Sequence, residues 1–518
     1  RQRQMCIRDR LNIETVMKQY KLLVAGMLAS AFMNTGCSDS FLEVESPVNE
    51  TIESYFTTDE HIREAIVAAY DPLHWPDWAM NEYNPVNIMS DIMADDIWVG
   101  GQDKTDMRTW HLMMNYEAIP TYVMAGLWTD AYSGVKRCND VLLYLTWAKD
   151  VTPENAEYYT AQVLTLRVFY YNWLWKFWGN IPYFTENLTA PYLAEQLKAD
   201  DVYNNIIADL ENVISMNVLP MKESADNYGR VTKAMAYMLY AEMVMYQNDE
   251  SRYAKALQYM QEIISSGQYG LLDDYAGIFK ESGEWSSESI YEVIYKDENA
   301  VRSWGSPLTA GGTVLPSLLS PHSWPDGAEG HDQGWGFCPV RQETYDRYAD
   351  NDTRRDVTCF DAAATGVTYN KRYQDTGFFL EKYAAISGNN KDQKADAQLN
   401  WNNNLRIYRY AETLLNAAEL LVRTNGNLAE AKKYLNAVRQ RAGLTTELEP
   451  TIDNIIEERH LEFVGEGKRY WDLIRSDKAA TTLVPDSYGY RTNSWTENKK
   501  YLPCLLYTSP SPRDISGS

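Results

Sequence analysis

The sequence predicts a mainly α-helical fold in which tetratricopeptide-like helical hairpins pack against a loop-rich, irregular region. Three observations lead to this prediction. Apolar residues recur at three- and four-residue spacing over long stretches, which is the periodicity of an amphipathic helix. Two pairs of these stretches match each other in the spacing of their alanine residues. A stretch at about 267–404 is instead rich in Gly, Pro, Asn, Asp and Trp, and this composition favours loops.

Helical periodicity is found on both sides of the loop-rich stretch. Helices are expected at 60–70, 124–146, 155–178, 200–216, 233–246, 251–265, 405–423, 428–442, 452–463 and 469–474. Thr232 directly precedes one of these helices, where its hydroxyl can cap an unpaired backbone N–H. Gly443 follows another and is a plausible helix-terminating glycine. Within the loop-rich stretch, residues 289–295 have a strand-like pattern.

The internal match concerns two expected helical hairpins. Ala241-Glu242 is followed 13 residues later by Ala254-Lys255, and Ala418-Glu419 is followed 13 residues later by Ala431-Lys432. Small alanines at fixed places in a hairpin let two helices approach closely. This is the arrangement of tetratricopeptide repeats, whose period is ~34 residues. The match therefore favours a scaffold of stacked hairpins.

Aromatic and methionine residues inside the expected helices are assigned to the core. The aromatic set consists of Tyr170, Tyr171, Trp173, Trp175, Phe177 and Trp178. The methionines are Met235, Met238, Met243 and Met245. Large side chains that recur on a helix among Leu and Val are typical of packing rather than of a ligand site.

The two ends of the sequence do not fit the rest of the chain. Residues 1–16 and 505–518 look like translated sequencing-adapter residue, and we expect them to be non-native. Residues 17–36 have the basic start and short apolar run of a signal peptide. The sequence Asn34-Thr35-Gly36-Cys37 then resembles a bacterial lipoprotein cleavage site, so Cys37 is the expected lipidation site. The mature protein is expected to be a single domain at 37–504.

The charge balance excludes one class of partner. The chain has 48 Lys and Arg against 72 Asp and Glu, which gives a net charge of −24. Affinity for nucleic acid depends on cationic side chains that face phosphates. We therefore expect no nucleic-acid partner.

Motifs along most of the chain are similar to those of one family. They include Gly229-Arg-Val-Thr-Lys233, Arg409-Tyr-Ala-Glu412, Leu435-Asn-Ala-Val-Arg439 and Trp471-Asp-Leu-Ile-Arg475. In this order they resemble the SusD/RagB family of outer-membrane glycan-binding lipoproteins of Bacteroidetes. The resemblance implies a surface-exposed, lipid-anchored, SusD-like protein that captures an oligosaccharide without cleaving it. It also implies delivery to a SusC-like TonB-dependent outer-membrane transporter.

Aromatic residues in the polar loops are the candidates for glycan contact. Tyr (38) and Trp (16) far outnumber Phe (12). An indole in a loop must pack on the scaffold or meet a partner, and a sugar ring offers an apolar C–H face that stacks on it. The candidates are Trp75, Trp78, Tyr83, Trp98, Trp285, Trp304, Trp324 and Trp335, with Asp96 as a hydrogen-bonding neighbour.

Two other functions stay open. A surface glycoside hydrolase would need two carboxylates at a cleft, and helical spacing places Glu458 and Glu462 on one face. These residues lie among arginines, so structural ion pairs between helices are the preferred interpretation. A helical-repeat scaffold that binds only protein would instead pack its loop tryptophans inward.

Metal and thiol chemistry have little support in the sequence. The carboxylates at 91–96 and 346–361 could hold a structural calcium ion, and we expect no other cofactor. His322 and His331 do not have zinc-site spacing, so no metal ligand is assigned. Cys138, Cys338 and Cys359 are expected to be small buried residues, although Cys338 and Cys359 could pair.

Overall fold

The computed structural model describes residues 51–79 and 81–505. The predicted non-native start, the signal peptide and Cys37 lie outside the described residues, as does the tail from 506 onward. The chain divides into two compact units, 1–55 and 56–518. In the first unit only helix α3 (Ile52–Tyr55) and Thr51 before it are described. The elements below belong to the second unit.

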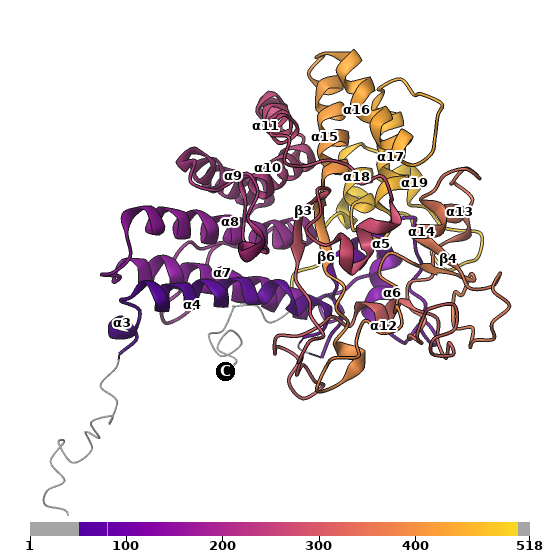
Figure 1. The fold of residues 1–518 in the computed structure, drawn as a ribbon, viewed down its shortest axis with the longest axis horizontal. Coiled ribbons are helices and arrows are strands. Elements are labelled where there is room, and N and C mark those ends of the chain that lie inside the picture. Colours follow the sequence, from indigo (N-terminus) through magenta and orange to yellow (C-terminus); the bar gives the residue numbers. More distant parts are fainter. Residues whose placement is uncertain (1–50, 80, 506–518) are drawn as a thin grey trace, which may run out of the picture. The chain divides into compact units, whose positions relative to one another are not determined.

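An array of helices forms one side of the second unit (Figure 1). Its members are α4 (Asp59–Tyr70), α7 (Ala125–Leu145), α8 (Pro153–Trp178), α9 (Ala199–Met216), α10 (Lys233–Gln247), α11 (Tyr253–Ser265), α15 (Tyr410–Arg423) and α16 (Leu428–Arg441). From α7 to α11 each helix packs on the next, α11 packs on α15, and α15 packs on α16. The predicted mainly α-helical fold with stacked hairpins is therefore confirmed.

Local signals predict the start of α10 correctly. The hydroxyl of Thr232 accepts a hydrogen bond from the backbone N–H of Met235 at 3.1 Å, which is the predicted N-cap. The helix is apolar on nearly all sides and buried between its neighbours. Gly443, just beyond α16, has a φ of +81°, which a glycine adopts without a steric penalty.

The alanine match between the two hairpins holds for the first helix of each hairpin but not for the second. Ala241 and Ala418 are both fully buried, as expected for close helix packing. Ala431 is also buried, but Ala254 is exposed. The reason is that α11 begins at Tyr253, so Ala254 lies in its first turn on the solvent side. The alanine of α11 that packs inward is Ala256.

The predicted helix at 405–423 begins five residues later than expected. Leu405–Arg409 forms strand β6, and the helix α15 starts at Tyr410. Strand β6 pairs antiparallel with β3 (Ser289–Val293), which confirms the strand-like pattern there. The partner strand lies more than a hundred residues away, so tertiary pairing overrides the local helical periodicity.

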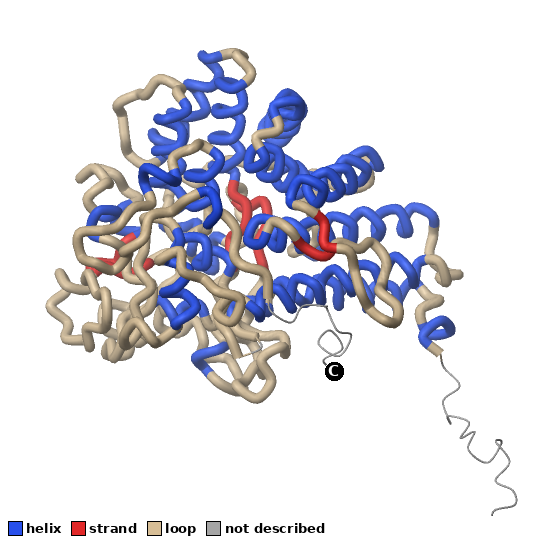
Figure 2. Tube along the Cα trace, turned by 180° about the vertical axis from the view of Figure 1, so that it is seen from behind, coloured by secondary structure: helices blue, strands red, loops and turns tan. Residues whose placement is uncertain are grey.

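Short elements and loops make up the rest of the second unit (Figure 2). The helices are α5 (Val86–Met93), α6 (Arg108–Met114), α12 (Leu315–Leu319), α13 (Gln342–Tyr345), α14 (Arg355–Thr358), α17 (Ile452–Phe463), α18 (Arg469–Arg475) and α19 (Ala479–Thr482). The remaining strands form two-stranded sheets, β1 (Ile181–Pro182) with β2 (Gln196–Leu197) and β4 (Cys359–Asp361) with β5 (Phe378–Leu380). Single turns of 3₁₀ helix are η1 (Asp71–Leu73), η2 (Trp75–Asp77), η3 (Ala225–Asn227), η4 (Glu250–Arg252), η5 (Ala276–Phe279), η6 (Glu281–Gly283), η7 (Ala397–Leu399) and η8 (Glu497–Lys499).

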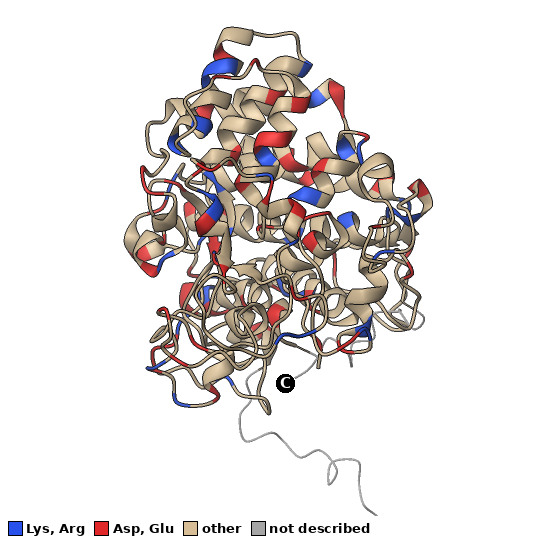
Figure 3. Cartoon of the chain, turned by 90° about the vertical axis from the view of Figure 1, so that its right-hand side faces the viewer, with Lys and Arg blue, Asp and Glu red and all other residues tan. Residues whose placement is uncertain are grey.

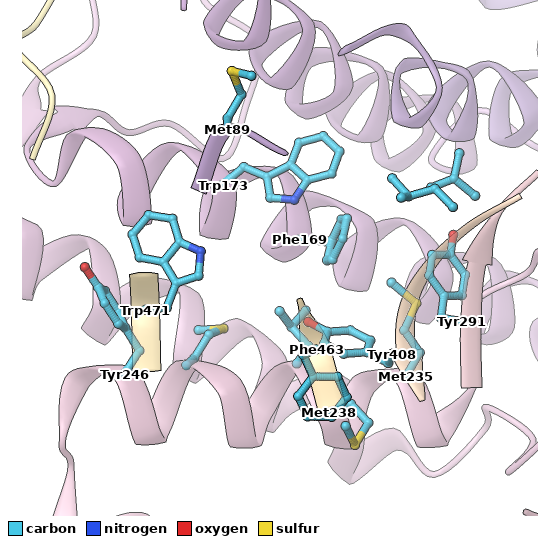
Figure 4. Close-up of a cluster of buried hydrophobic side chains, with 14 of the residues drawn as sticks. Met89, Phe169, Trp173, Met235, Met238, Tyr246, Tyr291, Tyr408, Phe463 and Trp471 are labelled. Carbon is cyan, nitrogen blue, oxygen red and sulfur yellow. The ribbon is translucent and has the colours of Figure 1, made fainter. Parts of the chain in front are cut away.

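Aromatic and methionine side chains fill the core between the helices and the β3–β6 pair. All six aromatics of the α8 set are buried, as are the four methionines of α10. Figure 4 shows Phe169 and Trp173 of α8 facing Tyr408 of β6 and Met235 of α10. Cys138, Cys338 and Cys359 are buried free thiols, in agreement with the expectation of small core residues.

Charged residues of both signs are interspersed over the helical part (Figure 3), and some lie inside the core. Arg409 of β6 contacts Glu288 at 2.7 Å, Glu462 at 3.0 Å and Glu466 at 2.7 Å. Arg441 at the end of α16 also contacts Glu288 at 2.8 Å. These ion pairs join α16, α17, strand β6 and the residue that precedes β3, so the structural role preferred for the charged motif residues is confirmed.

Candidate functional site

Four of the predicted loop aromatics meet in space, and we call them the aromatic platform: Trp78, Tyr83, Trp304 and Trp335. The rings of Trp78 and Tyr83 stack with centroids 4.5 Å apart. Trp304 lies 5.3 Å from Trp78 and 6.0 Å from Trp335, and Trp335 lies 5.7 Å from Tyr83. Each ring therefore touches two others, although the residues come from three distant segments.

Exposure differs across the platform. Trp78 is buried beneath the other rings, and Tyr83 and Trp335 are half-buried. Trp304 is 41% exposed, which is unusual for so large an apolar side chain. Because its neighbours hold the indole on two sides, the platform offers solvent a pre-arranged aromatic surface suited to stacking.

A buried ion pair holds two of the platform segments together. Arg302 donates to the carboxylate of Asp77 at 2.7 and 2.9 Å, and both side chains are excluded from solvent. Arg302 also donates to the carbonyl of Trp78 at 2.7 Å. Burial alone would lower the pKa of Arg302, but the Asp77 carboxylate raises it, so the guanidinium stays charged. This pair fixes Trp78 relative to Trp304, two residues beyond Arg302.

Polar groups surround the aromatic platform. The carboxylate of Asp396 accepts a hydrogen bond from the backbone N–H of Trp304 at 3.0 Å. Arg372 donates to the carbonyl of Trp335 at 2.6 Å and pairs with Asp106 at 3.2 Å. Asp106, Arg372 and Asp396 are not among the predicted candidates, since nothing in their local sequence distinguishes them from other charged loop residues.

The phenol of Tyr83 is a neutral hydrogen-bonding group at physiological pH. Burial raises its pKa to about 12, and the carboxylates of Asp106 and Asp77 act in the same direction. A protonated hydroxyl can both donate and accept, as sugar hydroxyls do.

The other candidates lie apart from the platform. Trp98 is 1% exposed and is covered by the guanidinium of Arg341, 3.6 Å from its ring centroid. Trp75 is buried under Arg137. Trp324 forms a small buried cluster with Phe379. Each of these indoles packs inward because the scaffold supplies a cation or a ring to cover it.

Asp96 and Trp285 are also separate from the platform. Asp96 is fully buried and contacts His460. Trp285 is half-buried and stacks on Tyr228, with centroids 5.2 Å apart and planes 13° from parallel. Sequence proximity to polar residues did not separate these positions from the platform residues.

We expect Asp77→Asn to weaken both the fold and the aromatic platform. The buried Arg302 would lose its counter-charge, while the amide oxygen could still accept one hydrogen bond. The free energy of unfolding should therefore fall by about 2–3 kcal/mol. Urea unfolding measures this loss, and unchanged stability would contradict the assigned role. Asp453→Asn, which removes an exposed carboxylate paired with Lys478, is the matched control.

The carboxylates that suggested other chemistry are engaged within the core. Arg354 contacts Glu458 at 2.7 Å and Glu462 at 3.1 Å, and all three side chains are buried. These two carboxylates are therefore not accessible to a substrate in this structure. A helical-repeat scaffold that binds only protein would pack its loop tryptophans inward, whereas Trp304 is 41% exposed.

The predicted calcium site stays a prediction. Among the described residues, Asp95, Asp96 and His460 form the one group whose ligand atoms lie close enough together to hold a metal ion. Arg469 donates to both oxygens of Asp95, at 2.8 and 3.0 Å, and so supplies positive charge there already. The ion pair explains this carboxylate without a metal.

The fold and the candidate site define a class: a helical-repeat protein whose loops carry a partly exposed aromatic platform. Two family models match the chain, "SusD family" at 356–502 and "Starch-binding associating with outer membrane" at 40–245. The chain belongs to the SusD family. The resemblance of the sequence motifs to this family is thereby confirmed.

Solved structures and curated relatives agree with this assignment. Surface glycan-binding protein A from Bacteroides thetaiotaomicron is 69% identical, with 87% of this chain and 96% of that chain covered and a TM-score of 0.84. That protein has also been solved in complex with laminarihexaose. A laminarin-binding SusD-like protein is 29% identical over 86% of this chain and 96% of that chain, with a TM-score of 0.77. SusD-like protein P25 from Formosa agariphila is 23% identical, covering 93% of this chain and 94% of the relative.

No helix in the described part of the chain combines the length and apolar character that a membrane span requires.

Proposed function

We propose that this protein captures a laminarin-type oligosaccharide at the cell surface without cleaving it and passes it to a SusC-like TonB-dependent transporter. The aromatic platform is the observation that carries the proposal. The 69% identity to a protein solved with laminarihexaose supports the choice of glycan.

The chemistry of the platform suits a neutral sugar. The C–H face of a glucose ring can stack on the exposed indole of Trp304, with Trp335 beside it. The Tyr83 hydroxyl and the charged groups of Arg372 and Asp106 would then bond the ring hydroxyls. Because the rings are held before the ligand arrives, little conformational entropy is lost on binding.

The remaining parts of the proposal rest on the sequence and on the family. Lipidation at Cys37 would attach the protein to the outer membrane, and one matching family model describes association with that membrane. Delivery to a transporter follows from the resemblance to the family. The absence of cleavage is supported by the names of the relatives, which are binding proteins.

Calorimetric titration of the purified protein with laminarihexaose tests the proposal. We expect one-to-one binding, and weaker or no binding of maltohexaose, which has the same sugar units in a different linkage. The titrated mixture should contain only intact hexasaccharide by chromatography. Shortened products would contradict non-catalytic capture, and equal affinity for both hexasaccharides would contradict the choice of glycan.

A further inference from the structure

A cavity of about 410 Å³ lies away from the aromatic platform, between α4, α8, β3 and the loop at 228–231. Its volume falls within the ~300–1,000 Å³ range of small-molecule sites. Its apolar wall residues are Ile66, Val67, Leu73, Val293, Ile294 and Ala310. Val67 is 68% exposed on α4, and Ile294 is also exposed. These walls disfavour a sugar, whose hydroxyls would be left unpaired against them.

A buried polar group lacks a partner at this cavity. Tyr291 of β3 is 1% exposed and lines the cavity, and its hydroxyl has no hydrogen-bond partner among the described residues. The hydroxyl points away from the methionine-rich core around Met235 (Figure 4). A group that enters the cavity and bonds the Tyr291 hydroxyl would give this hydroxyl a partner.

Positive charge also lines this cavity, although the chain as a whole is strongly acidic. Arg63 and Arg230 both line it, together with the carboxylates of Asp71 and Glu292. Asp71 is paired with Arg137 at 3.2 Å, and Glu292 lies 3.8 Å from Arg406. Arg63 shares a 3.1 Å ion pair with Asp59. Arg230 forms no ion pair with a carboxylate among the described residues and interacts with the hydroxyl of Tyr158. Arg230 is therefore the cation best able to pair with an incoming anion.

The stack of Trp285 on Tyr228 supports one wall of the cavity. Tyr228 lines the cavity, and Trp285 stacks on the Tyr228 ring. Trp285 has a positive φ of +54°, which is uncommon for a bulky residue. The loop thus maintains an unfavourable backbone conformation where it holds this wall in place.

From these observations we propose a second ligand site for an amphipathic organic carboxylate. Its apolar body occupies the cavity, its carboxylate pairs with Arg230, and a polar group at its far end bonds the Tyr291 hydroxyl. This site is independent of the glycan platform, because the two share no lining residue.

Calorimetry with two ten-carbon probes, decanoate and ω-hydroxydecanoate, tests the proposal at concentrations below micelle formation. Both probes should bind one to one, and ω-hydroxydecanoate should bind more tightly because it reaches Tyr291. Arg230→Gln should weaken both about 5–10-fold, the loss expected for one charge-assisted contact. Arg347→Gln, which removes a surface arginine elsewhere, is the matched control and should change nothing.

Two further variants probe the body of the cavity. Tyr291→Phe should remove the advantage of ω-hydroxydecanoate and leave decanoate unchanged. Val67→Trp, at an exposed position, should narrow the entrance and weaken both probes. Unchanged laminarihexaose binding confirms that each variant is folded. The proposal is overturned if neither probe binds, or if Arg230→Gln and Val67→Trp leave binding intact. If Tyr291→Phe still binds ω-hydroxydecanoate more tightly than decanoate, the role assigned to Tyr291 is overturned.

Discussion

Trp304→Ala is expected to reduce affinity for laminarihexaose at least about 10-fold, the effect of losing a binding hot spot. The indole is the most exposed ring of the aromatic platform, and it touches two of the other three rings. Alanine would remove the stacking surface for the sugar and leave its apolar face in water. Calorimetric titration measures the change in affinity.

Stability and a matched aromatic separate this effect from a general defect. The melting temperature should change little, since Trp304 is already 41% exposed in the folded protein. Tyr488→Ala is the control, because Tyr488 is 52% exposed but makes its ring contacts with Trp98 and Tyr490. Its removal should leave glycan affinity intact. Equal loss in both variants, or none in Trp304→Ala, would contradict the assignment of the platform.

Arg409→Met should destabilise the fold by about 3–5 kcal/mol or more, as expected when one partner of a buried ion pair is removed. The guanidinium is buried and contacts Glu288, Glu462 and Glu466, so the substitution leaves three buried carboxylates without that partner. Urea unfolding measures the loss. Arg347→Met breaks a surface pair with Glu457 and should cost only about 0–1 kcal/mol. A similar loss of unfolding free energy in both variants would contradict the larger stabilising role assigned to the buried ion pairs of Arg409.

The pH dependence of the unmodified protein tests the same network even if Arg409→Met does not fold. Burial alone would raise the pKa of Glu462, but Arg441 and Arg409 lower it to about 2. The pKa of Asp472, which faces Arg459 and Arg475, is likewise lowered to about 2. A carboxylate whose pKa is lowered in the folded protein stabilises the folded state at pH values above its unfolded pKa of ~4. The contribution of these two carboxylates is therefore complete above about pH 5, and the free energy of unfolding should fall as the pH decreases from about 4 to 2. A free energy of unfolding that rises as the pH is lowered across this range would contradict the stabilising role of these carboxylates.

Part of the fold follows from local sequence alone. Amphipathic spacing predicts the long helices of the array, because one face of each must be buried whatever it packs against. The Thr232 cap and the Gly443 terminus depend only on backbone groups within a few residues, so they too are predictable. The family motifs from β6 to α18 include core charges such as Arg409 and Glu462, whose partners are set by the fold.

Which residues form the site was decided by the tertiary structure. Trp98 and Trp304 both lie in polar loops. Arg341, far along the chain, covers Trp98, whereas Trp304 stays exposed at the surface. Strand β6 replaces a predicted helical start for the same kind of reason, since β3 supplies its hydrogen bonds from a distant segment. The sequence by itself determined the helical scaffold, the family and a set of aromatic candidates. The choice among those candidates depends on long-range contacts, because burial is a property of the packed molecule rather than of the local chain.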